Sequence, residues 1–325
     1  MNRLIVCTLL TAAAGVAATA PKYDPSLERV IWRAPHTLTT SDWVWGPGGQ
    51  QKAPTPPFQF VKENMGGTNP KVNVRDARGA LWIVKFGGEV HAEVFASRLL
   101  YAVGYSTEPT HFVAEGVITG ATGLQRAKPF IGKEGHFRDA RFKLRDERIQ
   151  SYASHDKWTW TSNPFAGSRE MNGLRILLML ASNWDTKDAR DGEGSNTAVF
   201  LRHNDGPDFY WYAMTDWGAT FGSWGGFFQR SRWNSEAYVH QTPHFVRGVK
   251  DGAIVWGFQG KHGEDITNGI STGDVRWLLP YLTAIHDEQL RVGLQASGAT
   301  PAGVKKFSSA IRNRIAQLER VAEAQ

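Results

Sequence analysis

The chain has 325 residues, of which 41% are hydrophobic and 21% charged, with one cysteine and a formal charge of +6. The apolar fraction excludes an intrinsically disordered chain, and a single cysteine excludes both a disulfide scaffold and a zinc module built on cysteines. No apolar run reaches the roughly 20 residues that a membrane-spanning helix needs. The mild positive charge gives little reason to expect a nucleic-acid partner. The length suits one large domain or two ordinary ones.

The first 20 residues have the pattern of a secretory signal peptide. A basic start, Met1-Asn2-Arg3, precedes an apolar stretch from Leu4 to Ala18, and small residues continue to Ala20. We therefore expect an exported protein, periplasmic or extracellular, because the small-residue end disfavours the alternative of a buried N-terminal helix. The one cysteine, Cys7, lies in this segment, so the mature chain is predicted to have none.

The N-terminal half of the remaining chain is predicted to be rich in strands. Residues 21–57 carry many prolines, tryptophans and threonines, and we expect an extended arm that packs its aromatic side chains on the protein body. Alternating apolar residues then predict a strand at 58–61 and a β-hairpin at 71–86. A helix over about 90–103 follows, because its apolar residues recur with helical spacing and Gly104 ends the pattern.

Residues 111–131 are predicted to hold further strands, and they run into a basic stretch at 125–150. That stretch has eight lysines and arginines against four acids. A solvated face is the simplest interpretation, and an acidic acceptor or an anionic surface is the alternative.

The second half of the chain is predicted to be mostly helical. A strongly apolar helix at 168–183 leads into a polar loop at 183–196, and a second hairpin follows at 197–214. The chain is mostly helical from about residue 275 and ends in an amphipathic helix at 301–322. This order predicts one α+β unit.

Three polar motifs follow one another along the chain, each next to a predicted strand or helix. Val84-Lys85-Phe86 ends a strand, and the next helix carries Glu93. The loop Asn183-Trp184-Asp185-Thr186-Lys187 leads to Asn196, and the second hairpin ends in Asp216-Trp217-Gly218. In these features the chain resembles the atypical branch of the protein-kinase-like superfamily, which includes the HipA-type, CotH-type and secretory-pathway kinases and the phosphoinositide kinases.

The resemblance covers roughly residues 58–325 and implies a bilobal fold. Its β-rich N-lobe would span 58–135 and its mostly helical C-lobe 136–325. The segment Asn163–Glu170 and the Asn-Trp-Asp-x-Lys loop also resemble a group of exported bacterial proteins of unknown role.

The resemblance implies Mg²⁺- or Mn²⁺-dependent binding of ATP or another nucleotide, with phosphoryl transfer to a protein or small-molecule acceptor. Lys85 would hold the α- and β-phosphates, and Glu93 would fix its ammonium group, with Glu89 as the second candidate. The turn at Gly66 and Gly67 would cradle phosphate with backbone N–H groups.

Asp185 would orient or deprotonate the acceptor hydroxyl, and Lys187 would stabilise charge on the transferred phosphoryl group. Asn196 and Asp216 would be oxygen ligands of the metal ion, since the hairpin brings them together. In the family, the aspartate usually precedes the asparagine by five residues. Here Asp185 precedes Asn196 by eleven residues, whereas Asp191 precedes Asn196 by five. Either the loop carries an insertion or Asp191 is the catalytic acid, and the Asp-x-Lys spacing favours Asp185.

Two other functions stay open from the sequence. The first is a catalytically inactive pseudokinase or ligand-binding protein, which would keep the fold without the phosphoryl transfer. This alternative stays open because a bacterial periplasm is not expected to hold ATP as the phosphate donor. A calcium-binding structural loop would use the carboxylates of Asp185, Asp188, Asp191 and Glu193, although their spacing does not match an EF-hand.

Overall fold

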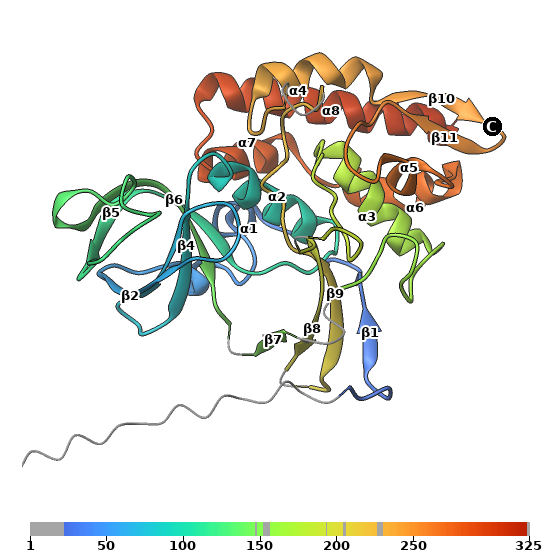
Figure 1. Ribbon diagram of the computed structural model, residues 1–325. Coiled ribbons are helices and arrows are strands. Elements are labelled where there is room, and N and C mark those ends of the chain that lie inside the picture. The colour runs from blue at the N-terminus through green and yellow to red at the C-terminus, as the bar shows by residue number, and fades with distance from the viewer. Residues whose placement is uncertain are drawn as a thin grey trace, which may run out of the picture.

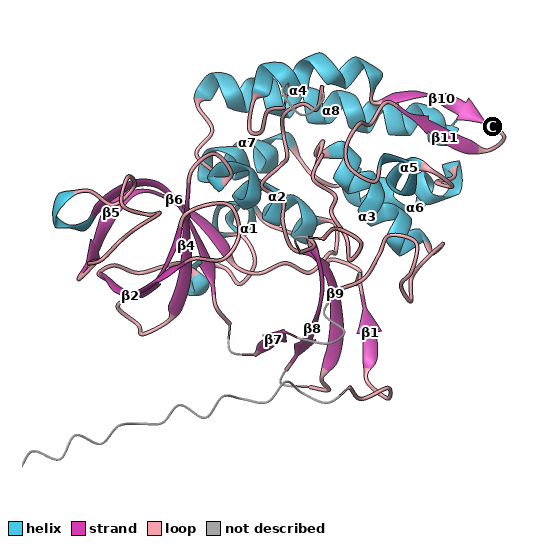
Figure 2. Ribbon diagram, in the orientation of Figure 1, coloured by secondary structure: helices cyan, strands magenta, loops and turns pink. Residues whose placement is uncertain are grey.

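The chain has two lobes of different composition, a β-barrel and a mostly helical body (Figure 1, Figure 2). The computed structural model describes residues 23–146, 148–151, 157–192, 194–203, 206–225 and 230–323. The predicted signal peptide lies outside the described residues. The prediction of a bilobal α+β fold with a β-rich N-lobe and a helical C-lobe is confirmed.

The N-lobe is a closed barrel with the strand order β2-β3-β4-β6-β5. Its strands are β2 (Phe58–Asn64), β3 (Lys71–Arg75), β4 (Leu81–Phe86), β5 (Thr110–Thr119) and β6 (His136–Leu144). Neighbouring strands are antiparallel except β2 and β5, whose parallel pairing closes the barrel. The barrel continues past the lobe boundary predicted at residue 135, because β6 pairs with both β4 and β5. The strands predicted up to residue 131 end at Thr119.

Alternation along the strands sorts side chains between the inside and the outside of the barrel. Val72, Val74, Trp82 and Val84 have no exposed surface and fill the interior. Lys85 comes between the buried Val84 and Phe86 and therefore projects from the other face.

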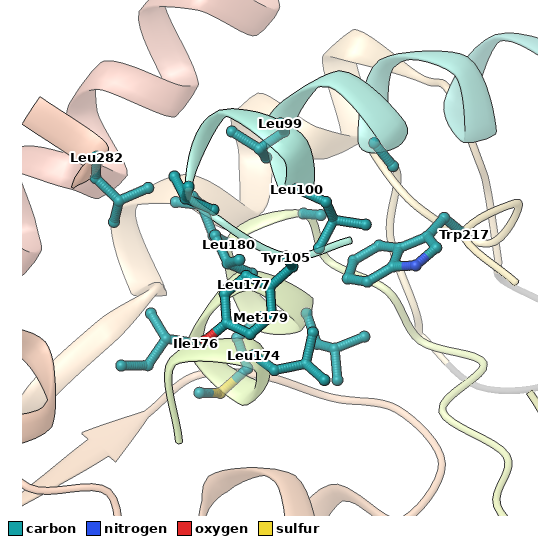
Figure 3. Packing of buried hydrophobic residues seen from close by; sticks show 14 of the residues in the cluster. Leu99, Leu100, Tyr105, Leu174, Ile176, Leu177, Met179, Leu180, Trp217 and Leu282 are labelled. Carbon is teal, nitrogen blue, oxygen red and sulfur yellow. The ribbon is translucent and has the colours of Figure 1, made fainter. Parts of the chain in front are cut away.

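Helices α2 (Val90–Ala102) and α3 (Arg169–Leu180) carry the centre of the main core. Figure 3 shows Leu99 and Leu100 of α2 beside the leucines of α3, with Trp217 at the edge of the cluster. Ser168 begins α3, since its hydroxyl accepts a hydrogen bond of 3.2 Å from the N–H of Met171 and such a cap stabilises a helix by about 1 kcal/mol. The core thus fixes the start of the loop that follows α3.

A four-stranded sheet lies below the helices in Figure 1, with the order β1-β9-β8-β7. Its strands are β1 (Glu28–Val30), β7 (Ile149–Ser151), β8 (Thr197–Arg202) and β9 (Phe209–Met214). The hairpin predicted at 197–214 is β8 and β9, which pair antiparallel from Thr197 opposite Met214. β1 pairs parallel to β9, so the N-terminal arm is part of this sheet.

The arm also contains helix α1 (Thr40–Trp45), which the prediction of an extended segment missed. A capping box causes this helix, since Thr39 and Asp42 each bind the other's backbone N–H group. The remaining elements are α4 (Ser235–Gln241), β10 (Val246–Lys250), β11 (Ala253–Trp256), α5 (Gly263–Thr267), α6 (Thr272–Thr283), α7 (Asp287–Ala296) and α8 (Pro301–Glu323). Within the described ranges, every helix is too short or too polar to cross a membrane.

Candidate nucleotide and metal site

Lys85 on β4 is the centre of a buried ion-pair network. Its Nζ contacts Oε1 of Glu93 on α2 and lies 3.0 Å from Oε2 of Glu89, which immediately precedes that helix. Arg141 on β6 reaches the other oxygen of Glu93, with 2.9 Å between its Nε and Oε2. Arg232 contacts Glu89. The network therefore joins the barrel to α2 and to the segment after β9.

The charges of this network hold one another in the ionised state. Burial lowers the pKa of Lys85, but the carboxylates of Glu93 and Asp216 raise it further than burial lowers it, so the net pKa lies above the ordinary value. Burial raises the pKa of Glu93, and the charges of Arg141 and Lys85 outweigh that effect and hold it at about 2. Lys71 has a lowered pKa, because it is partly buried and lies near Lys85 and Arg141. The pocket beside Lys85 is lined by six cationic side chains and three carboxylates, so it carries more positive charge than its own carboxylates neutralise.

The predicted glycine turn lies between β2 and β3, next to Lys71. The N–H of Gly66 donates to Oδ1 of Asn64 at 3.1 Å, so it is already engaged within the turn. Gly67 has a φ of +68°, and a Cβ at this position would lie 3.1 Å from Nζ of Lys71. Because Lys71 lines the same pocket as Lys85, the turn adjoins that pocket.

The hairpin of β8 and β9 brings Asn196 and Asp216 to the pocket of Lys85. The carbonyl oxygen of Asn196 accepts hydrogen bonds from the N–H of Thr215 at 2.6 Å and from its hydroxyl at 2.9 Å. Asp216 follows directly, and its Oδ1 accepts from the N–H of Gly218 at 2.9 Å. Lys85, Asn196 and Asp216 all line one pocket of about 380 Å³.

Three carboxylates, two that line this pocket and Glu89 beside it, are close enough to share a cation. Single carboxylate oxygens of Glu89, Glu93 and Asp216 lie within 4.8 Å of one another. Such oxygen donors, with the nearby amide of Asn196, suit Mg²⁺ or Mn²⁺. Lys85 contacts an oxygen of each glutamate, so a bound metal ion would share both glutamates with the ammonium group.

Asp185 is tied to the pocket through backbone contacts. Its carbonyl oxygen accepts a hydrogen bond of 2.7 Å from Nδ2 of Asn196. Its N–H donates to Oδ1 of Asn183 at 3.2 Å, and Nδ2 of Asn183 donates to the carbonyl oxygen of Asp216 at 3.1 Å. Asn183 is fully buried and thereby fixes the Asp185 loop against the end of the hairpin.

Two lysines flank the carboxylate of Asp185. Nζ of Lys261 lies 3.2 Å from Oδ1, and Nζ of Lys187 lies 3.9 Å from Oδ2. Asp185 and Lys187 adjoin the pocket of Lys85 through Asn196, and neither is among the residues that line it. The loop therefore presents a partly exposed carboxylate beside two cations.

Asp188 and Asp191 of the loop belong to a separate network, and Glu193 lies outside the described residues. Oδ2 of Asp191 accepts from the N–H of Asp188 at 2.8 Å and lies 2.9 Å from Nε2 of His262. Arg190 contacts Asp188 and lies 2.7 Å from Asp265. Asp188, His262 and Asp265 come within 4.8 Å of one another, but the guanidinium group of Arg190 already contacts both carboxylates.

The basic stretch at 125–150 is not one solvated face, contrary to the simplest interpretation of its sequence. Arg141 is 3% exposed, and Lys143 is paired with Glu108 at 2.8 Å. Both line the pocket together with Arg145, because alternate side chains of β6 face it. The alternation of cations at 141, 143 and 145 is the sequence signal that could have found Arg141. Glu89 was only a second candidate from the sequence, and nothing in the sequence distinguished Asn183 from other loop residues.

A strand lysine is paired with a helix glutamate, a loop follows α3, and a hairpin returns an asparagine and an aspartate to the same pocket. This is the arrangement expected of a kinase-like fold. No family model and no curated protein matches the sequence. Among solved structures, the Golgi casein kinase is similar to this chain. Its structure with Mn and ADP bound aligns at 14% identity and a TM-score of 0.42, over 83% of this chain and 73% of that chain. A second structure of that kinase aligns at 13% identity with the same TM-score and coverage.

Proposed function

We propose that this chain is an exported phosphotransferase that binds a nucleotide with Mg²⁺ or Mn²⁺ in the pocket of Lys85. The observation that carries the proposal is the convergence of Lys85, Asn196 and Asp216 on one pocket. Elements far apart in the sequence supply a buried cation for phosphate and oxygen donors for a metal ion. Phosphoryl transfer depends mainly on such positioning and charge neutralisation.

Each residue then has a defined part in binding. Lys85, held by Glu93, would bind phosphate oxygens, and Lys71 and Arg141 supply further positive charge. Asp216 and Asn196 would hold the metal ion. A metal ion bound there would neutralise charge on the phosphates.

In the transfer step, we propose that Asp185 accepts the proton of an acceptor hydroxyl. The hydroxyl oxygen forms a bond to the terminal phosphorus, the bond from that phosphorus to the bridging oxygen breaks, and the nucleoside diphosphate leaves. Asp191 is less suited to this role, because His262 and the N–H of Asp188 already occupy its carboxylate. Lys187 and Lys261 lie beside Asp185, where they would stabilise the developing negative charge.

The test is a thermal shift followed by a transfer assay. ATP with Mg²⁺ at a hundredfold excess over Kd should stabilise the protein by about 2.7 kcal/mol, and Asp216→Ala should abolish that shift. Asp287→Ala, an exposed aspartate on α7, is the matched control and should keep it. Asp185→Asn should keep the shift and lose transfer in an assay with several donors and acceptors.

The remaining outcomes separate the alternatives. A nucleotide shift with no transfer by the natural protein to any acceptor would indicate a pseudokinase. A larger shift with calcium alone that Lys85→Ala leaves unchanged would indicate a calcium-binding structural protein, and would contradict the proposed function.

A further inference from the structure

A second cationic pocket, of about 320 Å³, shares no lining residue with the pocket of Lys85. Its walls come from the N-terminal arm, from the turn between α2 and β5, from the segment that joins β6 to β7, and from the β8–β9 hairpin. The function proposed above makes no use of it. We refer to it as the arm pocket.

The arm pocket has more cations than carboxylates. Its cationic lining residues are Arg33, Lys52, Arg148 and Arg202. Among the described residues that line it, Asp146 is the only carboxylate, and it is paired with Arg148 at 3.1 Å. Arg33 is paired with Glu28, which is not part of the lining, at 2.7 Å. Lys52 and Arg202 have no ion-pair partner within 4.0 Å in the part of the chain that the structure describes.

Arg202 is the cation of the arm pocket that is best placed to bind an anionic ligand. Its guanidinium carbon lies 6.0 Å from the ring centroid of Trp211, and no described residue accepts a hydrogen bond from its side chain. Burial lowers its pKa, Asp146 raises it, and the neighbouring charges of Arg148 and Arg33 lower it again, with a net lowering. A half-buried guanidinium beside two others is therefore incompletely neutralised by the residues that the structure describes.

The rest of the arm pocket combines apolar and aromatic side chains with the polar His36, Ser106 and Thr107. Phe209 lies beneath Arg33, with 4.4 Å from the guanidinium carbon to the ring centroid. Tyr101 packs edge-on against His36 at a centroid distance of 5.9 Å. Pro35, Pro47 and Pro109 complete these walls. The volume and the mixture of apolar walls with a few charged groups are those of a site for a small organic molecule.

We propose that the arm pocket binds a small phosphate monoester. The planar guanidinium fork of Arg202 matches two phosphate oxygens, and Lys52 supplies the second charge. The organic part of the ester packs on Tyr101 and on the prolines of the wall. Because its walls come from the arm and from both lobes, the ligand links all three.

The experiment is isothermal titration of the full chain with phenyl phosphate and, separately, with inorganic phosphate. Arg202→Gln should weaken phenyl phosphate binding about tenfold or more, since a charge-assisted pair is lost. Arg169→Gln is the matched control, because Arg169 also lies over a tryptophan, 5.8 Å from the ring of Trp277, but outside the arm pocket. Lys85→Met should leave phenyl phosphate binding unchanged, which would distinguish binding in the arm pocket from binding in the pocket of Lys85.

Three results would overturn the proposal. Unchanged binding in Arg202→Gln would exclude the arm pocket, and loss of all binding in Lys85→Met would place the phosphate in the other pocket. Equal affinity for inorganic phosphate and phenyl phosphate would exclude the ester. If Arg202→Gln does not fold, Lys52→Gln removes the second charge from a lysine without an ion-pair partner among the described residues, and it should weaken phenyl phosphate binding in the same direction.

Discussion

At the scale of single residues, Glu93 differs from Glu89 although both contact Lys85. Glu93 is buried and shared between Lys85 and Arg141, and its pKa is held at about 2. Glu89 contacts Lys85 and the partly exposed Arg232. Removing one member of a buried network leaves the others uncompensated, which costs more than the pair contributes. Glu93 is therefore the residue on which the stability of the site most depends.

We predict that Glu93→Gln lowers the free energy of unfolding by about 3–5 kcal/mol at pH 7, because Lys85 and Arg141 lose their shared carboxylate. Glu115→Gln, at an exposed position of β5, should change it by less than about 0.5 kcal/mol. Urea unfolding of both variants measures the difference. Equal losses in the two variants would contradict the buried network.

The pKa of Glu93 also predicts a pH dependence. Since it lies at about 2 in the folded state against an ordinary 4.5, the unfolded chain takes up the proton first as the pH falls. The stabilisation from Glu93 is present above about pH 4.5 and is lost progressively towards pH 2. Urea unfolding between pH 5 and pH 3 should show a steeper loss in the natural protein than in Glu93→Gln, and parallel losses would refute this assignment.

At the scale of elements, the position of the Asp185 loop depends on how α8 holds the end of α3. Arg314 on α8 is 1% exposed. Its Nη1 donates to the carbonyl oxygens of Met179 and Leu180 at 3.2 and 2.9 Å and to the hydroxyl of Ser182 at 2.7 Å. The two carbonyl oxygens lie at the C-terminus of α3, where a cation is favoured. They also accept hydrogen bonds from the N–H of Ser182 at 3.0 Å and from the hydroxyl of Tyr238 at 2.6 Å, respectively. The contact fixes the chain one residue before the Asn183 loop begins.

We predict that Arg314→Met destabilises the protein by about 3 kcal/mol or more, because the buried hydrogen bonds from the guanidinium group to several acceptors are lost together. Arg312→Met is the matched control on the same helix, since Arg312 is paired with the exposed Asp287 and such a pair contributes under about 1 kcal/mol. Guanidinium unfolding gives both values. Similar values for the two variants would show that Arg314 does not anchor α3.

At the scale of the whole molecule, the N-terminal arm joins the sheet to the lobes. Its β1 strand pairs with β9, and Nε1 of Trp32 donates to the carbonyl oxygen of Val103 at 2.7 Å. The N–H of Arg33 donates to the carbonyl oxygen of Gly104 at 3.0 Å. Gly104 has a φ of +92°, and a Cβ there would lie 2.2 Å from the carbonyl oxygen of Arg33. The arm therefore packs where only glycine leaves room for it.

We predict that Gly104→Ala displaces the arm and destabilises the protein by more than about 1 kcal/mol, through both the clash and the unfavourable φ. Gly120→Ala separates these causes, because Gly120 has a φ of +75° with no atom within 4 Å of the added Cβ. Faster hydrogen exchange at residues 28–33 in Gly104→Ala alone would report the displaced arm. Equal hydrogen exchange in both variants would assign the whole loss of stability to the unfavourable φ angle.

Much of the fold could be predicted from the sequence because local periodicity carries it. The helix predicted at 168–183 is α3 within a few residues, and the second hairpin has the predicted strands. The α1 helix was missed, because six residues are too few for a periodic pattern. The predicted end of the N-lobe at residue 135 excludes β6, because nothing local in the sequence of β6 shows that it pairs with both β4 and β5.

The sequence by itself determined the order of strands and helices and the set of candidate residues, since spacing and alternation are properties of neighbours along the chain. Only the tertiary structure decided that Glu89 joins Glu93 on Lys85, that Arg141 is buried beside them, and that His262 engages Asp191. These contacts join distant segments. The strength of each charge interaction depends on burial, which the packing of the whole chain sets.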